Sequence, residues 1–98
     1  MPSATNHELT SDEVASQIEA IKPIIGAGTN AVDENEMLEI GEMMLHYMNQ
    51  WDMLDSDVRN EVNILYYLWD TKRVDGLVSD ALEELSTTIA LKQILLRE

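Results

Sequence analysis

The chain has 98 residues, the length of one small domain with a single hydrophobic core. Its 19 acidic and 6 basic residues give a formal net charge of −13, and 45% of the residues are hydrophobic. That hydrophobic share is too high for an acidic disordered tail. The excess of acid disfavours direct binding to nucleic acid or to an anionic membrane, because both need basic patches. The lack of cysteine excludes disulfides and thiolate chemistry, and no stretch reaches the ~20 apolar residues of a membrane span.

The first predicted helix follows a polar opening segment. We expect residues 1–9 to form a flexible lead-in and residues 10–98 to form a single all-helical domain. Thr10 and Glu13 have capping-box spacing, and Val14, Ile18 and Ile21 follow at helical spacing. Because proline lacks an amide hydrogen and disfavours helical geometry at the residue before it, the helix is predicted to stop or kink at the proline in position 23. The segment 26–30 (Gly-Ala-Gly-Thr-Asn) predicts a break.

The second predicted helix, from Glu34 to Leu54, is the most apolar part of the chain. Asp33 and Glu36 form a second cap-like pair at its start. Apolar residues then alternate in steps of three and four, as in a heptad seam: Met37, Ile40, Met44, Tyr47, Trp51 and Leu54. Four further apolar residues widen that seam over most of the circumference: Leu38, Met43, Leu45 and Met48. We therefore expect this helix to be buried centrally or shared with a partner, because it has more apolar surface than the other helices can cover.

Two more helices are predicted in the second half of the chain. The segment 55–57 (Asp-Ser-Asp) can cap a third helix, whose apolar face carries Val58, Val62, Leu65 and Trp69. The segment 74–76 (Val-Asp-Gly) predicts a turn, after which residues 78, 82, 85 and 89 mark a fourth helix with a broadly apolar end. Period-two alternation is absent. The predicted fold is all-α: a small four-helix bundle, or three long helices with one short one.

The charge is unevenly distributed along the chain. Residues 1–58 hold 12 acids and one base, whereas residues 59–98 hold 7 acids and 5 bases. The first half is therefore a negative surface, which either docks a basic partner or only keeps the protein soluble.

Residue patterns for catalysis or cofactor binding are weak. Glu42 and His46 lie one turn apart, but this spacing differs from the Glu-x-x-His pairs of di-iron bundles, and we expect no metal. The Asp55-Ser56 pair resembles the attachment site of carrier proteins, but Asp57 stands where those proteins have leucine, and a helix cap explains the serine. With no defensible catalytic triad either, we expect neither an enzyme nor a bound cofactor.

The pattern favours a non-enzymatic interaction protein, such as a chaperone, adaptor or inhibitor, in the cytoplasm. Methionine-rich helical surfaces accept varied apolar partners, and the acids add attraction for a basic one. We expect a protein partner with a basic and apolar surface, and a homodimer is compatible with the same features. The predicted partner-binding residues are Met37, Glu39, Met44, Met48, Trp51, Glu34, Glu36 and Glu42. The alternative is a DNA mimic that inhibits a nucleic-acid-binding protein or nuclease.

Overall fold

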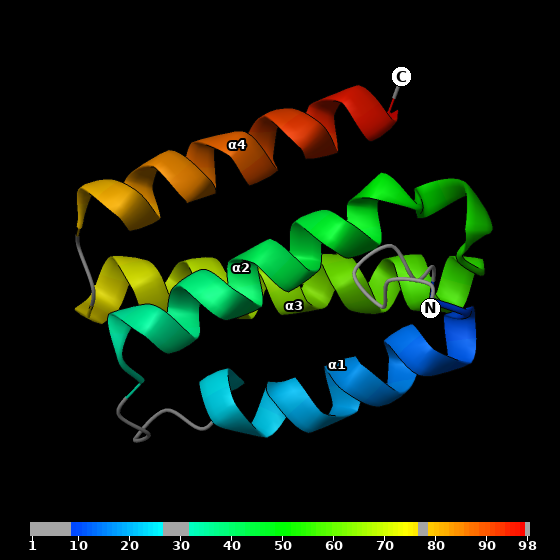
Figure 1. Ribbon diagram of the computed structural model, residues 1–98, viewed down its shortest axis with the longest axis horizontal. Helices are drawn as coiled ribbons and strands as arrows, with labels where there is room; N and C mark the ends of the chain where they lie inside the picture. The colour runs from blue at the N-terminus through cyan, green and yellow to red at the C-terminus, as the bar shows by residue number, and fades with distance from the viewer. Residues whose placement is uncertain (1–8, 27–31, 77–78, 98) are drawn as a thin grey trace, which may run out of the picture.

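The computed structural model describes residues 9–26, 32–76 and 79–97, and in these residues it contains helices and no strands (Figure 1). The elements in chain order are α1 (Ser11–Gly26), α2 (Glu34–Asn49), the short 3-10 helix η2 (Trp51–Met53), α3 (Ser56–Gly76) and α4 (Asp80–Arg97). Successive α-helices run in opposite directions, with α2 and α3 in the middle and α1 and α4 on opposite sides of them (Figure 1). The closest helix pairs are α2–α4, α1–α3 and α2–α3. The prediction of an all-α four-helix bundle is confirmed.

Both predicted capping boxes start their helices. The amide of Thr10 donates to Glu13 Oε1 at 2.9 Å, and the amide of Glu13 donates to Thr10 Oγ1 at 3.1 Å. At the start of α2 the amide of Glu36 donates to Asp33 Oδ1 at 2.8 Å, and the amide of Asp33 donates to Glu36 Oε1 at 3.3 Å. These bonds satisfy amides that have no partner inside the helix, so each helix begins at a residue fixed by local sequence.

Two predicted boundaries are wrong, and of the two outcomes predicted at Pro23 the stop does not occur. Helix α1 continues through Pro23 to Gly26, because so near its end the proline disrupts little of the hydrogen-bond ladder and Ile25 gains a buried position. Helix α2 ends at Asn49, not at residue 54, and the chain tightens into η2. The predicted turn at 74–76 is the last turn of α3. The predicted break at 26–30 begins with Gly26, which is the last residue of α1. Its residues 27–30 and the apolar position 78 lie outside the described residues.

The side chain of Gln50 ties the start of α1 to the end of α2. Its Oε1 accepts from the amide of Leu9 at 3.1 Å, and its Nε2 donates to the carbonyl of Leu9. Leu9, the last residue of the expected lead-in, is also half-buried against the core. Leu9 therefore belongs with the bundle, whereas residues 1–8 lie outside the described part of the chain.

Side chains from all four α-helices form the core. Its fully enclosed side chains are Trp69, Tyr47, Ile18, Met37, Met44, Met48, Leu65, Leu82, Ile89, Val14 and Val62. The indole N–H of Trp69 donates to the carbonyl oxygen of Met37 at 2.7 Å, so the one polar atom of this large ring is satisfied inside the core. The predicted inward face of α3 is confirmed, since Val58, Val62, Leu65 and Trp69 are all buried.

Helix α2 approaches α3 and α4 closely at Gly41. A Cβ atom placed there would lie 2.5 Å from Leu85 Cδ2 and 3.0 Å from Trp69 Cζ2, both shorter than an ordinary van der Waals contact. The missing side chain thus allows the backbone of α2 to pack against the side chains of its two neighbours.

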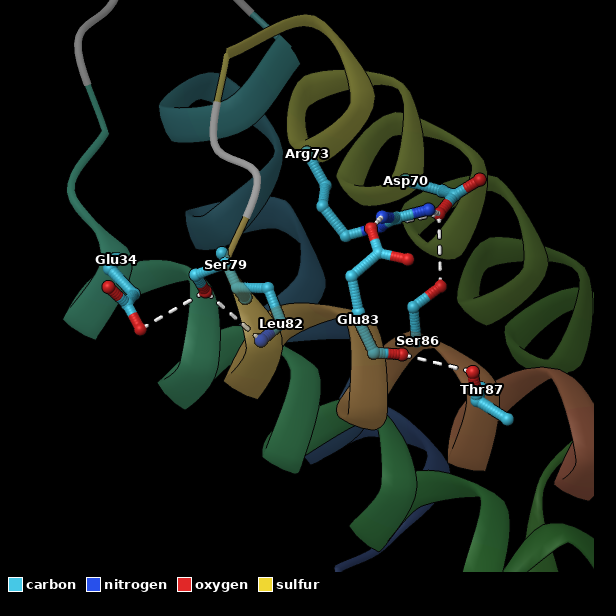
Figure 2. A network of polar contacts seen from close by, with 8 residues as sticks. All are labelled: Glu34, Asp70, Arg73, Ser79, Leu82, Glu83, Ser86 and Thr87. Atoms are coloured by element: carbon cyan, nitrogen blue, oxygen red, sulfur yellow. Dashed lines mark hydrogen bonds and ion pairs between the residues drawn. The ribbon is translucent and has the colours of Figure 1, made fainter.

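A network of charged and hydroxyl side chains fastens α4 to α3 (Figure 2). Asp70 Oδ1 accepts from Arg73 Nε at 3.0 Å, from Arg73 Nη2 at 2.8 Å and from Ser86 Oγ at 3.3 Å. Arg73 also forms an ion pair with Glu83. Because the Arg73 side chain is only 11% exposed, this network is shielded more than a surface ion pair is. It fixes where the start of α4 lies against the end of α3.

Candidate functional site

The candidate site is a groove of about 550 Å³ between α1 and α2. Its lining residues are Gln17, Ile21 and Ile24 from α1 and Glu36, Glu39, Ile40, Glu42, Met43, His46 and Tyr47 from α2. The three α1 positions are four and three residues apart, and every α2 position lies three or four residues from another in the set, so each helix contributes one continuous face. We call this feature the α1–α2 groove.

The floor of the α1–α2 groove is apolar. Ile21 and Ile40 are buried at its base, Met43 is half-buried, and Ile24 is 39% exposed. A partner can therefore touch the branched side chain of Ile24 and the flexible thioether of Met43 without any change in the bundle. Such a mixture fits apolar groups of different shapes, because methionine adapts its conformation.

One end of the groove is closed by a hydrogen bond between its two helices. The hydroxyl of Tyr47 donates to Gln17 Oε1 at 2.6 Å, and the Tyr47 side chain is fully buried. Burial raises the pKa of Tyr47 from its usual 10.0 to about 12, so the phenol remains neutral at physiological pH. Tyr47 therefore acts as a fixed wall of the groove and a link between α1 and α2.

The rim of the groove is acidic. Glu36, Glu39 and Glu42 are exposed on α2, and His46 lies one turn after Glu42. Of the ten lining residues in the described chain, none is lysine or arginine. The closest base in sequence, Lys22, lies beside Ile21, but its Nζ pairs with Glu61 Oε1 on α3 at 2.8 Å. The hydrogen bond to Glu61 raises the pKa of Lys22, which keeps that amine charged and bound to α3.

Three acids among the predicted partner-binding residues thus come together on this rim, and one does not. Glu36, Glu39 and Glu42 line the groove, although Glu36 also serves the capping box of α2. Glu34 lies outside the set of lining residues, and its Oε2 accepts from Ser79 Oγ at 3.2 Å near the start of α4 (Figure 2). Glu34 therefore connects α2 to the segment before α4.

The predicted apolar partner residues lie elsewhere. Met37, Met44 and Met48 are 0%, 0% and 1% exposed, so they pack in the core, where a partner could reach them only by opening the bundle. Trp51 is half-buried in η2, with the guanidinium of Arg59 5.7 Å from the centre of its ring. Part of the apolar surface of α2 does stay uncovered by its neighbours, since Leu38, Met43 and Leu45 are only half-buried, but none of these three is a predicted partner-binding residue.

Sequence reasoning missed the contribution of α1 to this site. Ile24 lies beyond Pro23, where the helix was predicted to stop or kink, so it was not assigned to a helical face. The apolar pattern of α2 places Met43 among the residues that widen its seam, whereas in the structure it is the methionine that lines the groove. The spacing of Gln17, Ile21 and Ile24 along one helix face was the available signal.

Other kinds of site have no counterpart among the residues that the structure describes. Within 9–26, 32–76 and 79–97, no group of three His, Asp or Glu side chains is placed to hold a metal ion. In the same ranges, no helix is long and apolar enough to cross a membrane. Comparison with protein families, with curated proteins and with solved structures gave no match.

Proposed function

We propose that this protein is a non-enzymatic binding protein whose α1–α2 groove receives a basic, amphipathic segment of another protein. The observation that carries the proposal is an apolar floor bordered by acids, with no lysine or arginine among the lining residues. Chaperones, adaptors and protein inhibitors of this physical kind hold a partner by its apolar side chains and select it by charge.

The apolar floor would supply most of the affinity. Ile24 and Met43 offer contacts to a helix that presents anchors one turn apart, as in other complexes where a helix lies in a groove. The acidic rim would select partners whose flanking residues are lysine or arginine and would speed their approach. Because these carboxylates are exposed, each should contribute ~1 kcal/mol or less.

The test is binding of a synthetic amphipathic helix made of leucine and lysine, measured by fluorescence anisotropy with the full chain. A scrambled peptide of the same composition and a polylysine peptide are the comparison ligands. We expect the amphipathic peptide to bind at least about tenfold more tightly than either, because only it presents an apolar face to the floor. Binding should weaken as salt increases, since salt screens the exposed acids.

Matched variants locate the site. The double change Glu39→Gln with Glu42→Gln should weaken binding by about tenfold, within the range for two exposed charges. Asp52→Asn with Asp75→Asn removes the same charge from exposed positions outside the groove and should leave binding nearly unchanged. Met43→Gln keeps the length of the side chain but makes the floor polar, so it should also weaken binding.

The DNA-mimic alternative predicts a different pattern. A mimic binds by charge alone, so polylysine would bind as well as the amphipathic peptide, and both double variants would weaken binding equally. That pattern would refute the groove as the binding site and favour the alternative. Each variant must first retain its helical circular dichroism signal and its melting temperature.

A further inference from the structure

A second hollow, of about 410 Å³, lies between the end of α2 and the C-terminal half of α4. Its lining residues are Leu45, Asn49, Thr88, Leu91, Lys92 and Leu95. On each helix every one of these positions lies three or four residues from another, so each helix contributes one face. The volume is within the ~300–1,000 Å³ of small-molecule sites. We call this feature the α2–α4 hollow.

Three leucines give the α2–α4 hollow an apolar surface. Leu45 is half-buried, and Leu91 and Leu95 are 57% and 68% exposed. Single exposed leucines are common on soluble proteins, whereas neighbouring ones form a patch to which an apolar group can bind. A ligand can contact these leucines without any change in the bundle.

The charge of the hollow is opposite to that of the chain. The chain has 19 acids and 6 bases, yet of the six lining residues one is a base, Lys92, and none is an acid. Within the described residues Lys92 forms no ion pair, whereas Lys22 and Arg73 each pair with a carboxylate. In the described part of α4 the acid nearest to Lys92 in sequence is Glu84, eight residues earlier and so about 12 Å away along the helix axis.

The position of Lys92 places its charge beside the apolar patch. The residue is half-buried, and a half-buried lysine packs its aliphatic stem against apolar neighbours while its ammonium group stays in water. It follows Leu91 directly and precedes Leu95 by three residues. At the α2 side of the hollow, the side-chain amide of Asn49 offers a further hydrogen-bond donor.

We infer that the α2–α4 hollow binds a small amphiphile with one carboxylate and an unbranched alkyl chain, such as a medium-chain fatty acid. The carboxylate pairs with Lys92, and the alkyl chain lies against Leu45, Leu91 and Leu95. A cationic amphiphile of the same length meets Lys92 as a like charge. The inference does not depend on the proposed function of the α1–α2 groove, because α1 and α4 lie on opposite sides of the bundle (Figure 1).

The net charge of −13 makes this inference sharply testable. Without a local site, such a chain attracts a cationic amphiphile more than an anionic one. At physiological salt the Debye length is about 8 Å, so the acids on the far side of the bundle are largely screened from the hollow. A preference for the anion at the hollow therefore requires a nearby base.

The experiment is a titration of the full chain followed by the amide resonances of Leu91, Lys92 and Leu95 in nuclear magnetic resonance spectra. The two probes are decanoate and decyltrimethylammonium, each below the concentration at which it forms micelles. We expect decanoate to bind with a dissociation constant on the order of 1 mM, as for other ligands of about 12 non-hydrogen atoms. At these resonances it should bind at least about fivefold more tightly than the cation, since one exposed ion pair contributes up to about that factor.

Matched variants locate the two parts of the ligand. Lys92→Gln should weaken decanoate binding about fivefold, and Arg97→Gln, which removes the same charge from an exposed position of α4 outside the lining, less than about twofold. Leu95→Gln should weaken binding several-fold, because it makes the apolar patch polar. Ile94→Gln is its control, since Ile94 is 54% exposed on the same helix but does not line the hollow.

Three results would overturn the inference. The first is equal or tighter binding of the cation at these resonances, and the second is an equal effect of Lys92→Gln and Arg97→Gln. The third is a wild-type chain that sediments as a dimer and whose three resonances do not respond to decanoate, because a second copy would then cover the leucines.

Discussion

Replacement of Gly41 by alanine should destabilise the bundle, although alanine is the better helix former. The new methyl group would lie 2.5 Å from Leu85 Cδ2 and 3.0 Å from Trp69 Cζ2. Leu85 is half-buried and can rotate, but Trp69 is fully buried and its indole N–H is bonded to Met37 at 2.7 Å. Overpacking of this kind costs about 2 kcal/mol, and the gain in helix propensity offsets about 1 kcal/mol of it. The expected net loss is about 1 kcal/mol.

Urea and thermal unfolding, followed by circular dichroism, measure this loss. For a domain of this size, 1 kcal/mol corresponds to a decrease of roughly 4–8 °C in melting temperature. Gly76→Ala is the matched control, because a Cβ atom there meets nothing within 4 Å and the residue has no positive φ. The control should be neutral or slightly stabilising. If Gly41→Ala is as stable as the wild type, the close packing of α2 against α3 and α4 is refuted.

Three further predictions concern the core, the α3–α4 network and the buried phenol. Met44→Ala should lower the free energy of unfolding by about 3 kcal/mol, as for other buried methionines, and Met43→Ala by less than about 1 kcal/mol. Equal losses for the two variants in urea unfolding would contradict their different burial. Arg73→Gln should lower the free energy of unfolding by about 2 kcal/mol, because Asp70 loses two charged hydrogen bonds. A melting temperature unchanged from the wild type would show that the network does not stabilise the bundle. The pKa of Tyr47 is higher in the folded than in the unfolded chain, so its contribution to stability is complete below pH 10.0 and is lost as pH rises through about 12. Tyr47→Phe should therefore unfold less steeply with pH in this range, and an alkaline unfolding profile identical to the wild type would refute the assignment.

The helices were predictable because local sequence determines them. Capping boxes at Thr10 and Asp33 and the apolar spacing of α3 each depend on residues within one or two turns. The end of α2 was not predictable in the same way. Apolar spacing continues through Trp51 to Leu54, yet the helix ends at Asn49 and η2 begins at Trp51. At this point Gln50 binds Leu9, which lies 41 residues earlier in the chain. Such a distant contact leaves no periodic signal in the sequence.

The acidic residues of the α1–α2 groove were among the predicted partner-binding residues, whereas its apolar residues were not. Acids on α2 were identified correctly as neighbours because helical spacing alone places Glu39 and Glu42 on one side. The packing of α1, α3 and α4 around α2 decides which methionines face outward. The spacing of residues within α2 does not contain this information. Close packing at Gly41 brings α4 and α3 near enough to enclose Met37 and Met44, so these two methionines face the core and not a partner.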